Sequence, residues 1–236
     1  MHLTESTDAA VVLVPGLGNN ARLWRSQVEA LSDDREIIVA DYSGAESIDE
    51  MADRALAQVS AATFSLVGFS LGGYIALRMA VRAAERIHRL ALVSTSPYSD
   101  SEKAVQQRKV LISRAEQDYG SLLDDMSRFV IFADGPQADT ARAVFIRMGQ
   151  ELGVEEFCRQ QRAAMQRADC CDLLGSIRCP VQVLCGEEDR VTPVTGNRYL
   201  AENIPGATLE IIHGAGHLLP LERPTEVNRF LRGWLQ

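Results

Sequence analysis

The sequence contains no long apolar run and few aromatic residues, which make up 6% of its 236 positions. No segment approaches the roughly 18 consecutive apolar residues that a membrane-spanning helix needs, so we expect no membrane partner. The first ten residues, MHLTESTDAA, lack the basic and apolar segments of a secretion signal. These absences together predict a cytoplasmic protein.

Acidic residues outnumber basic residues, and the cysteines lack the C-x-x-C spacing of metal or redox sites. Lys and Arg number 24 against 32 Asp and Glu, a formal net charge of −8, which argues against nucleic acid or another polyanion as a partner. The five cysteines are an odd set in the second half of the chain, and none shows C-x-x-C spacing. The sequence therefore indicates neither a disulfide framework nor a zinc site.

Six short apolar runs are the main positive signal. A continuous apolar run bounded by turn residues is typical of a strand buried on both faces of a parallel sheet. The runs are residues 11–14, 36–40, 64–69, 89–94, 181–186 and 208–213. Amphipathic segments lie between the first four runs and between the last two. This pattern predicts an α/β domain, with a mainly parallel sheet of about six strands and helices on both faces.

The stretch from Ser99 to Leu174 interrupts this alternation. It contains no strand candidate, its apolar residues recur at helical spacing, and it breaks at Asp134-Gly135-Pro136. We interpret it as an inserted helical cap over the carboxyl edge of the sheet. The chain then divides into a core of residues 1–98 and 175–236 and a cap of residues 99–174. The alternative is that these helices pack on a face of the sheet as an ordinary core layer.

The first strand ends in a glycine-rich turn whose sequence allows two interpretations. Residues 16–21, GLGNNA, fit the dinucleotide-binding pattern G-x-G-x-x-[GA], and Asp41 follows Ala21 by twenty residues, after the next strand. The same strand, turn and helix could instead offer a backbone N–H to a developing oxyanion. A lone glycine pattern is a weak signal, so this turn by itself does not distinguish the two interpretations.

A second turn carries a more specific pattern. Residues 68–72, GFSLG, place Ser70 between a strand and a helix, the setting in which G-x-S-x-G presents a strained serine hydroxyl above a sheet. The helix that follows favours negative charge at its N-terminus, and we expect the Leu71 N–H to be one oxyanion donor. Ser70 is the candidate nucleophile, and the alternative is a serine with a structural role only.

A serine nucleophile needs a base, and the base needs an acid that sets its tautomer. His217 follows the last strand in a glycine-containing loop that can reach over the sheet, whereas His213 ends the strand itself. We therefore favour His217 as the base. Asp189 follows the penultimate strand in VLCGEEDRVTP, which yields the chain order Ser, Asp, His of hydrolases of this type. The alternative for Asp189 is a solvated turn residue.

Four segments together resemble the α/β-hydrolase superfamily, in particular its small esterase-like members with a helical cap. They are VPGLGNNARLW, GFSLGGYIALRMA, CGEEDRVTP and GAGHLLPLERP, in this order over nearly the whole chain. The resemblance implies that Ser70 is the nucleophile, Asp189 the acid and His217 the base, and that Leu17 and Leu71 supply the oxyanion N–H groups. It also implies that no cofactor takes part.

The sequence departs from this superfamily at three places. Pro15-Gly16 stands where His-Gly is common, which removes a side chain but leaves the backbone donor. The first ten residues leave no room for the usual antiparallel hairpin, so we expect six strands rather than eight. YSGAES follows Asp41 where many relatives carry Arg-Gly-x-Gly, which predicts a more open mouth to the site. Glu222 and Pro224 match the usual tail after the histidine and are expected to be structural.

The resemblance makes hydrolysis of a small ester-like substrate through an acyl-enzyme the leading function, with activity that falls as the histidine protonates. The composition of the cap suggests an apolar acyl or aromatic pocket lined by Tyr98, Phe129, Met165 and Leu218. Lactonase, thioesterase, acyl-carrier methyl esterase and C–C bond hydrolase stay open on the same three residues, as does a non-catalytic small-molecule receptor. A dinucleotide-dependent oxidoreductase explains only one of the four segments. The oligomeric state cannot be read from the sequence.

Overall fold

The structure, a computed structural model, describes residues 10–33 and 35–236. Its centre is a sheet of six strands in the order β2-β1-β3-β4-β5-β6, in which all neighbouring strands run parallel. The strands are β1 (Ala10–Val14), β2 (Ile37–Val39), β3 (Phe64–Phe69), β4 (Ile87–Val93), β5 (Val181–Gly186) and β6 (Thr208–Ile212). The chain winds from β1 to one edge first and then to the other. The predicted parallel sheet of six strands is confirmed.

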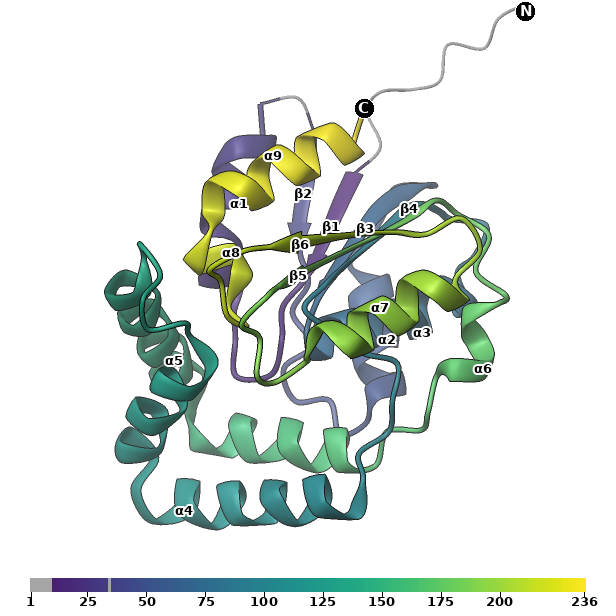
Figure 1. The fold of residues 1–236 in the computed structure, drawn as a ribbon. Coiled ribbons are helices and arrows are strands. Elements are labelled where there is room, and N and C mark those ends of the chain that lie inside the picture. The colour runs from purple at the N-terminus through teal and green to yellow at the C-terminus, as the bar shows by residue number, and fades with distance from the viewer. Residues whose placement is uncertain (1–9, 34) are drawn as a thin grey trace, which may run out of the picture.

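Helices cover both faces of the sheet (Figure 1). On one face lie α1 (Arg25–Leu31), α8 (Leu219–Glu222) and α9 (Pro224–Trp234), and on the other lie α2 (Ile48–Ala57), α3 (Leu71–Arg82) and α7 (Val194–Asn203). A 3₁₀ turn, η1 (Ala21–Trp24), precedes α1, and three helices separate β4 from β5, namely α4 (Glu102–Val130), α5 (Ala138–Met165) and α6 (Cys171–Leu174). Helices on both faces follow from parallel pairing, because each crossover must pass over the sheet.

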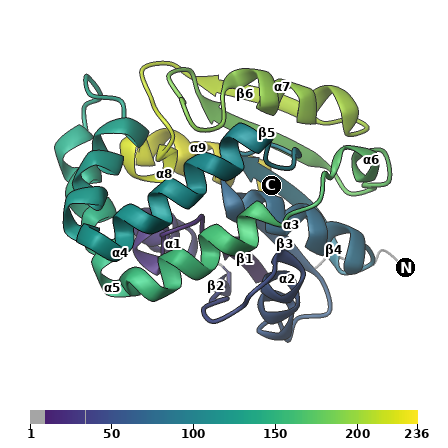
Figure 2. The ribbon, with the colours of Figure 1, turned by 90° about the horizontal axis from the view of Figure 1, so that it is seen from below.

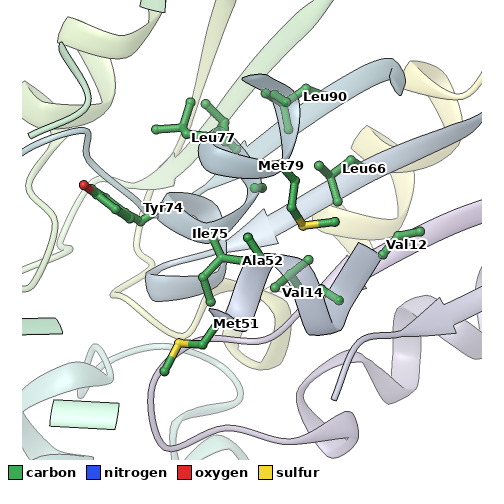
Figure 3. Close-up of a cluster of buried hydrophobic side chains, with 14 of the residues drawn as sticks. Val12, Val14, Met51, Ala52, Leu66, Tyr74, Ile75, Leu77, Met79 and Leu90 are labelled. Carbon is green, nitrogen blue, oxygen red and sulfur yellow. The ribbon is translucent and has the colours of Figure 1, made fainter. Parts of the chain in front are cut away.

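The strands send alternate side chains into two buried clusters, one on each face. Along β1, Val12 and Val14 join the cluster beneath α2 and α3, whereas Val11 and Leu13 join the cluster beneath α1 and α9. All four side chains are fully buried, which is why the run reads as continuously apolar. Figure 3 shows the first cluster, in which side chains of β1, β3 and β4 lie against those of α2 and α3.

Helices α4 and α5 lie across the carboxyl ends of the strands and pack against each other (Figures 1 and 2). We refer to α4 and α5 as the cap. Both helices are kinked, α4 at Asp118 (φ −152°, ψ 87°) and α5 at Gly153 (φ 80°, ψ 163°). Ala115, Leu122 and Phe157 form a small apolar cluster within the cap, and the partly buried Leu17 packs against it. The cap therefore touches the loop that follows β1.

The chain returns from the cap to the core before residue 174. Ala163, Ala164, Cys170 and Leu174 belong to the same buried cluster as α2 and α3. In its packing, the segment from Ala163 onward is therefore part of the core. The limits 1–98, 99–174 and 175–236 themselves stay a prediction.

Local sequence explains where two of these helices begin. The side chain of Ser47 accepts a hydrogen bond from the Glu50 N–H at the start of α2, and that of Ser101 accepts one from the Ala104 N–H at the start of α4. Each bond satisfies an N–H group that the first helical turn leaves free, and such a bond typically stabilises a helix by about 1 kcal/mol. Ser101 thus marks the point at which the chain leaves the core for the cap.

Within residues 10–33 and 35–236, no helix combines the length and the apolar character that crossing a bilayer requires. The expectation that no hairpin precedes β1 concerns residues 1–9, which lie outside the described residues.

Gly72 allows α3 to approach β1 more closely than any side chain would permit. A methyl group added at Gly72 would lie 2.2 Å from the Val14 carbonyl oxygen and 2.3 Å from that of Pro15, and backbone atoms cannot move aside without shifting the strand. We expect Gly72→Ala to lower the free energy of unfolding by about 3 kcal/mol, at the upper end of overpacking penalties. Urea denaturation followed by circular dichroism measures this change.

The matched control is Gly233→Ala in α9, where an added methyl group would meet no atom within 4 Å. Because alanine favours a helix more than glycine does, this variant should be neutral or gain up to ~1 kcal/mol. Equal losses in the two variants would contradict the close-approach argument.

Candidate active site

Ser70 lies at the turn between β3 and α3 in a backbone conformation that few residues adopt. Its φ is 53° and its ψ is −118°, outside the regions that L residues favour. The Ser70 N–H donates to the Val93 carbonyl at 2.9 Å, and the Thr95 hydroxyl donates to the Ser70 carbonyl at 2.7 Å. Strain of this kind clusters at functional sites, and a strained serine here is what G-x-S-x-G predicts.

His217 connects Ser70 to Asp189. His217 Nε2 is 2.9 Å from Ser70 Oγ, and His217 Nδ1 is 2.8 Å from Asp189 Oδ2, both within hydrogen-bond range. His217 and Asp189 are each 5% exposed, and the imidazole packs against the Phe69 ring with the centroids 5.0 Å apart. The loops after β3, β5 and β6 thus bring together three side chains that are far apart in the sequence.

Asp189 is held by the short segment that follows it. Its Oδ1 accepts from the Val191 and Thr192 N–H groups, and its Oδ2 accepts from the Thr192 hydroxyl, each at 2.8 Å. Burial raises the pKa of Asp189, but the charge of His217 and the hydrogen bonds from His217 and Thr192 outweigh it, so the pKa lies below the usual range of Asp. Sequence reasoning missed Thr192, although a threonine three residues after an aspartate in a loop is a signal for such a turn.

The loop after β1 leaves the Leu17 N–H free. Among the described residues, neither the Leu17 N–H nor the Leu71 N–H donates to a protein acceptor. The next two N–H groups of that loop are occupied, since Gly18 donates to Gln160 Oε1 at 2.8 Å and Asn19 donates to a carbonyl of the same turn at 3.1 Å. The Leu17 N–H is therefore available as a donor, and Leu71 is the first residue of α3.

Glu222 fastens the histidine loop to the cap. Its Oε2 accepts from the Gly216 N–H at 2.8 Å and from the Phe132 N–H at 2.9 Å, and the His217 N–H donates to the Val130 carbonyl at 2.9 Å. Glu222 is 1% exposed, and this burial raises its pKa although the N–H groups oppose the shift. The end of α4 and the histidine loop are thus joined by three hydrogen bonds.

One family model matches most of the chain. Residues 9–224 match the family model described as the alpha/beta hydrolase fold. The chain belongs to the α/β-hydrolase fold family. The resemblance inferred from the four sequence segments is thereby confirmed. Membership also favours the oxyanion interpretation of residues 16–21 over the dinucleotide one, because in this fold the loop after the first parallel strand contributes a backbone donor.

Proteins similar to this α/β-hydrolase carry names that refer to different roles. It is 26% identical to RutD of Yersinia enterocolitica, whose name assigns it provisionally as a carbamate hydrolase, over 95% of this chain and 86% of that protein. It is 27% identical to the biotin biosynthesis bifunctional protein BioHC of Teredinibacter turnerae over 97% of this chain, but spans 45% of that protein's length. The structure of a thermophilic esterase from Thermogutta terrifontis is similar with a TM-score of 0.83 and 25% identity, covering 96% of this chain and 89% of the esterase.

The predicted pocket residues of the α/β-hydrolase lie in different environments. Leu218 is 1% exposed within the cluster beneath α1 and α9, and Met165 is half-buried at the end of α5. Tyr98 is 38% exposed and packs on Tyr199 of α7, with ring centroids 5.3 Å apart. Phe129 is 54% exposed. The buried residues of α4 form its inward face, and helical periodicity places Phe129 on the outward face.

The candidate catalytic side chains lie beneath the cap. Two surface pockets of about 470 and 300 Å³ are lined by other residues and include neither Ser70 nor His217, and Ser70 is half-buried. The YSGAES loop is bonded to the cap, because the Gly44 N–H donates to Glu156 Oε2 of α5 at 3.0 Å. The more open mouth that this short loop predicts stays a prediction.

The other histidines and the cysteines stand apart from this arrangement. His213 pairs with Glu187 at 2.8 Å on the surface, and His88 is exposed near the start of β4. The five cysteines are free thiols. In the part of the chain that the structure describes, no three His, Cys, Asp or Glu side chains are grouped so as to hold a metal ion.

We expect Asp189→Asn to remove a pH-dependent part of the stability. Because folding lowers the pKa of Asp189, its carboxylate contributes stability that is fully present above the unfolded-state pKa, near 3.8, and is lost as the pH falls through the folded-state pKa. The difference in unfolding free energy between wild type and variant should therefore shrink below pH ~4. Urea titrations across the acid range measure it, and a difference that does not change with pH would contradict the assignment.

Glu222→Ala should destabilise the protein by about 2 to 5 kcal/mol, because it leaves two buried N–H groups without an acceptor at about 1 to 3 kcal/mol each. Glu222→Gln keeps an oxygen in reach of the Gly216 and Phe132 N–H groups and should lose less than half as much. Chemical denaturation of the two variants measures the contrast. If both variants lose the same amount, the anchoring role is wrong.

Proposed function

We propose that this α/β-hydrolase is a serine hydrolase of small carboxylic esters. The observation that carries the proposal is the hydrogen-bonded chain from Ser70 Oγ through His217 to Asp189, at 2.9 and 2.8 Å, on a strained turn. A serine with only a structural role needs neither a strained backbone nor an imidazole oriented by a buried carboxylate. In this proposal Ser70 is the nucleophile, His217 the general base and Asp189 the acid that orients it.

In the first half of the reaction, Ser70 Oγ attacks the carbonyl carbon while its proton passes to His217 Nε2. Asp189, whose carboxylate is held ionised, stabilises the imidazolium that forms. The carbonyl oxygen becomes an oxyanion and accepts hydrogen bonds from the Leu17 and Leu71 N–H groups. Collapse of this intermediate breaks the bond to the alcohol, which leaves with the proton from His217.

In the second half, a water molecule gives a proton to His217 and attacks the acyl carbon bound to Ser70. The second tetrahedral intermediate uses the same oxyanion donors. Its collapse breaks the bond to Ser70 Oγ, which regains its proton from His217, and releases the carboxylic acid. Thr192 and Glu222 support this cycle because they keep the acid and the histidine loop in place.

The apolar underside of the cap favours an apolar acyl or aromatic group as substrate. Tyr119 and Phe157 pack with their ring centroids 5.4 Å apart, and Leu17 lies against the same cluster. Since Leu17 is also a proposed oxyanion donor, an acyl group bound at Ser70 would lie next to these side chains. Met165, at the end of α5, remains a proposed part of this lining.

Carbamate hydrolysis is the second candidate, favoured by the similarity to RutD, whose name assigns it provisionally to that activity. Ser70 would attack the carbamate carbonyl in the same way, and His217 would protonate the leaving group. A carbamate carbonyl is less electrophilic than an ester carbonyl because the nitrogen donates electron density to it. Rates on an ester and a carbamate of the same alcohol therefore separate the two candidates.

We expect the wild-type protein to hydrolyse p-nitrophenyl esters and Ser70→Ala to lose at least about 10⁴-fold in kcat, because removing the nucleophile disables the catalytic residues as a unit. Initial rates over a series of acyl lengths measure this loss, and the optimum length reports the size of the pocket.

The matched control is Ser94→Ala. Ser94 also has a positive φ, 47°, follows the neighbouring strand β4, and has a buried hydroxyl without a partner in the described residues. We expect its kcat to stay within about threefold of wild type, as for a side chain outside the reacting groups. Equal loss in both serine variants, or in neither, would refute the assignment of Ser70. A wild type that labels with a fluorophosphonate at Ser70 but turns over neither ester nor carbamate would favour a receptor.

A further inference from the structure

The oxyanion hole proposed above depends on the orientation of one peptide unit. In a trans peptide the carbonyl and the following N–H point in opposite directions, and the described residues contain no cis peptide bond. The direction of the Leu17 N–H is therefore set by the direction of the Gly16 carbonyl. Glycine at positions 16 and 18 gives the backbone on either side wide freedom. Within the turn the Asn19 N–H donates to the Gly16 carbonyl at 3.1 Å, which leaves a place for a second support from outside the turn.

The hydroxyl of Tyr42 supplies that support. Tyr42 Oη lies 3.0 Å from the Gly16 carbonyl oxygen and 2.9 Å from the Pro15 carbonyl oxygen. A phenol carries one proton, which the two carbonyls share. Tyr42 is 3% exposed and follows β2, the strand that pairs with β1. Its ring is therefore packed in place against the loop whose carbonyls it contacts.

We propose that Tyr42 is a positioning residue for the oxyanion hole, because its hydroxyl holds the Gly16 carbonyl and thereby aims the Leu17 N–H at the oxygen of the reacting carbonyl. This inference rests on the proposed serine-hydrolase function. Tyr42 acts through the peptide unit and does not touch the substrate. A hydrogen bond to the Gly16 carbonyl also polarises that peptide and makes its N–H a better donor.

The Tyr42 hydroxyl keeps its proton under the conditions in which the enzyme would work. Burial, together with the negative charges of Glu156 and Asp41, raises the pKa of Tyr42 above its usual range. The phenol therefore remains a donor at neutral pH. Loss of activity in a variant without this hydroxyl then reports the loss of a hydrogen bond and not the loss of a charge.

The other side of the loop is held by the cap. The Gly18 N–H donates to Gln160 Oε1 at 2.8 Å, and Gln160 Nε2 donates to Glu156 Oε1 at 3.0 Å. Glu156 Oε2 accepts from the Gly44 N–H, two residues after Tyr42, at 3.0 Å. The proposed donor thus lies between two anchors of one largely buried network. Of these two anchors, the tyrosine acts on the peptide unit that carries the donor, as does the Asn19 N–H within the turn, and Tyr42 is the one whose hydrogen bond a single substitution removes.

Tyr42→Phe removes the hydroxyl and keeps the ring, and Tyr74→Phe is its matched control. Tyr74 is 2% exposed, and among the described residues its hydroxyl donates to no backbone carbonyl. The measurements are kcat and KM on the best p-nitrophenyl ester, the thermal midpoint, and inhibition by two ketones. A trifluoromethyl ketone forms a serine adduct that carries an oxyanion, whereas the matching methyl ketone binds as an intact ketone.

Tyr42→Phe should lower kcat about tenfold with KM within about twofold, a smaller loss than the ~10²–10³-fold cost of removing an oxyanion donor outright. The inhibition constant of the trifluoromethyl ketone should rise by the factor that kcat/KM loses, because both report stabilisation of the oxyanion. The methyl ketone should bind as it does to wild type, and Tyr74→Phe should leave kcat, KM and both inhibition constants unchanged.

Wild-type kcat and wild-type trifluoromethyl ketone affinity in Tyr42→Phe would overturn the proposal. So would an equal weakening of both ketones, or a loss of kcat that Tyr74→Phe shares. Failure of the proposed function looks different, since the wild type would then show no turnover that depends on Ser70 before any tyrosine is changed, and the inference about Tyr42 would fall with it.

Discussion

The close packing of the β3–α3 turn against β1 is the constraint on which the rest of the site depends. A strained residue such as Ser70 costs on the order of 1–3 kcal/mol, and it persists because its surroundings cannot relax. β3 is paired on both sides by β1 and β4, and the absence of a side chain at Gly68 and Gly72 lets α3 approach the strands, since an added Cβ would lie within 2.4 Å of a backbone oxygen at either position. The serine hydroxyl is thus presented from a closely packed turn between a central strand and α3.

Each loop that approaches Ser70 is supported by a polar side chain. Thr192 holds Asp189, Glu222 holds the histidine loop, and Tyr42 contacts the carbonyls of the loop after β1. These contacts lie in poorly hydrated surroundings, where hydrogen bonds are stronger and unpaired groups are more costly than in water. The supports are neutral hydroxyls except at Glu222, whose charge is balanced by backbone donors.

The cap is part of this support as well as a cover. It is inserted between β4 and β5, yet it bonds to the loops that follow β1, β2 and β6, through Gln160, Glu156 and the Val130 carbonyl. An exchange of the cap helices would therefore disturb the geometry around Ser70 and not only the shape of the substrate pocket. The segment from Ala163 onward belongs to the same insertion in the sequence, yet its side chains pack with the core.

The sequence by itself determined the six strands and the places of Ser70, Asp189 and His217. Continuous apolar runs between amphipathic segments are typical of strands in a parallel sheet, although the edge strands β2 and β6 are only partly buried. The carboxyl ends of parallel strands meet at one edge. Tertiary structure alone decided the rest. Tyr42 and Gly16 are 26 residues apart, and Gln160 and Gly18 are 142 residues apart, so no local pattern links them. The exposure of Phe129 and the contact between Glu156 and the loop after β2 were beyond prediction for the same reason, because the inward face of α4 and the reach of Glu156 depend on how the cap docks. Periodicity encodes which faces are buried, whereas a polar residue in a loop has the same local sequence whether it meets water or a buried carbonyl.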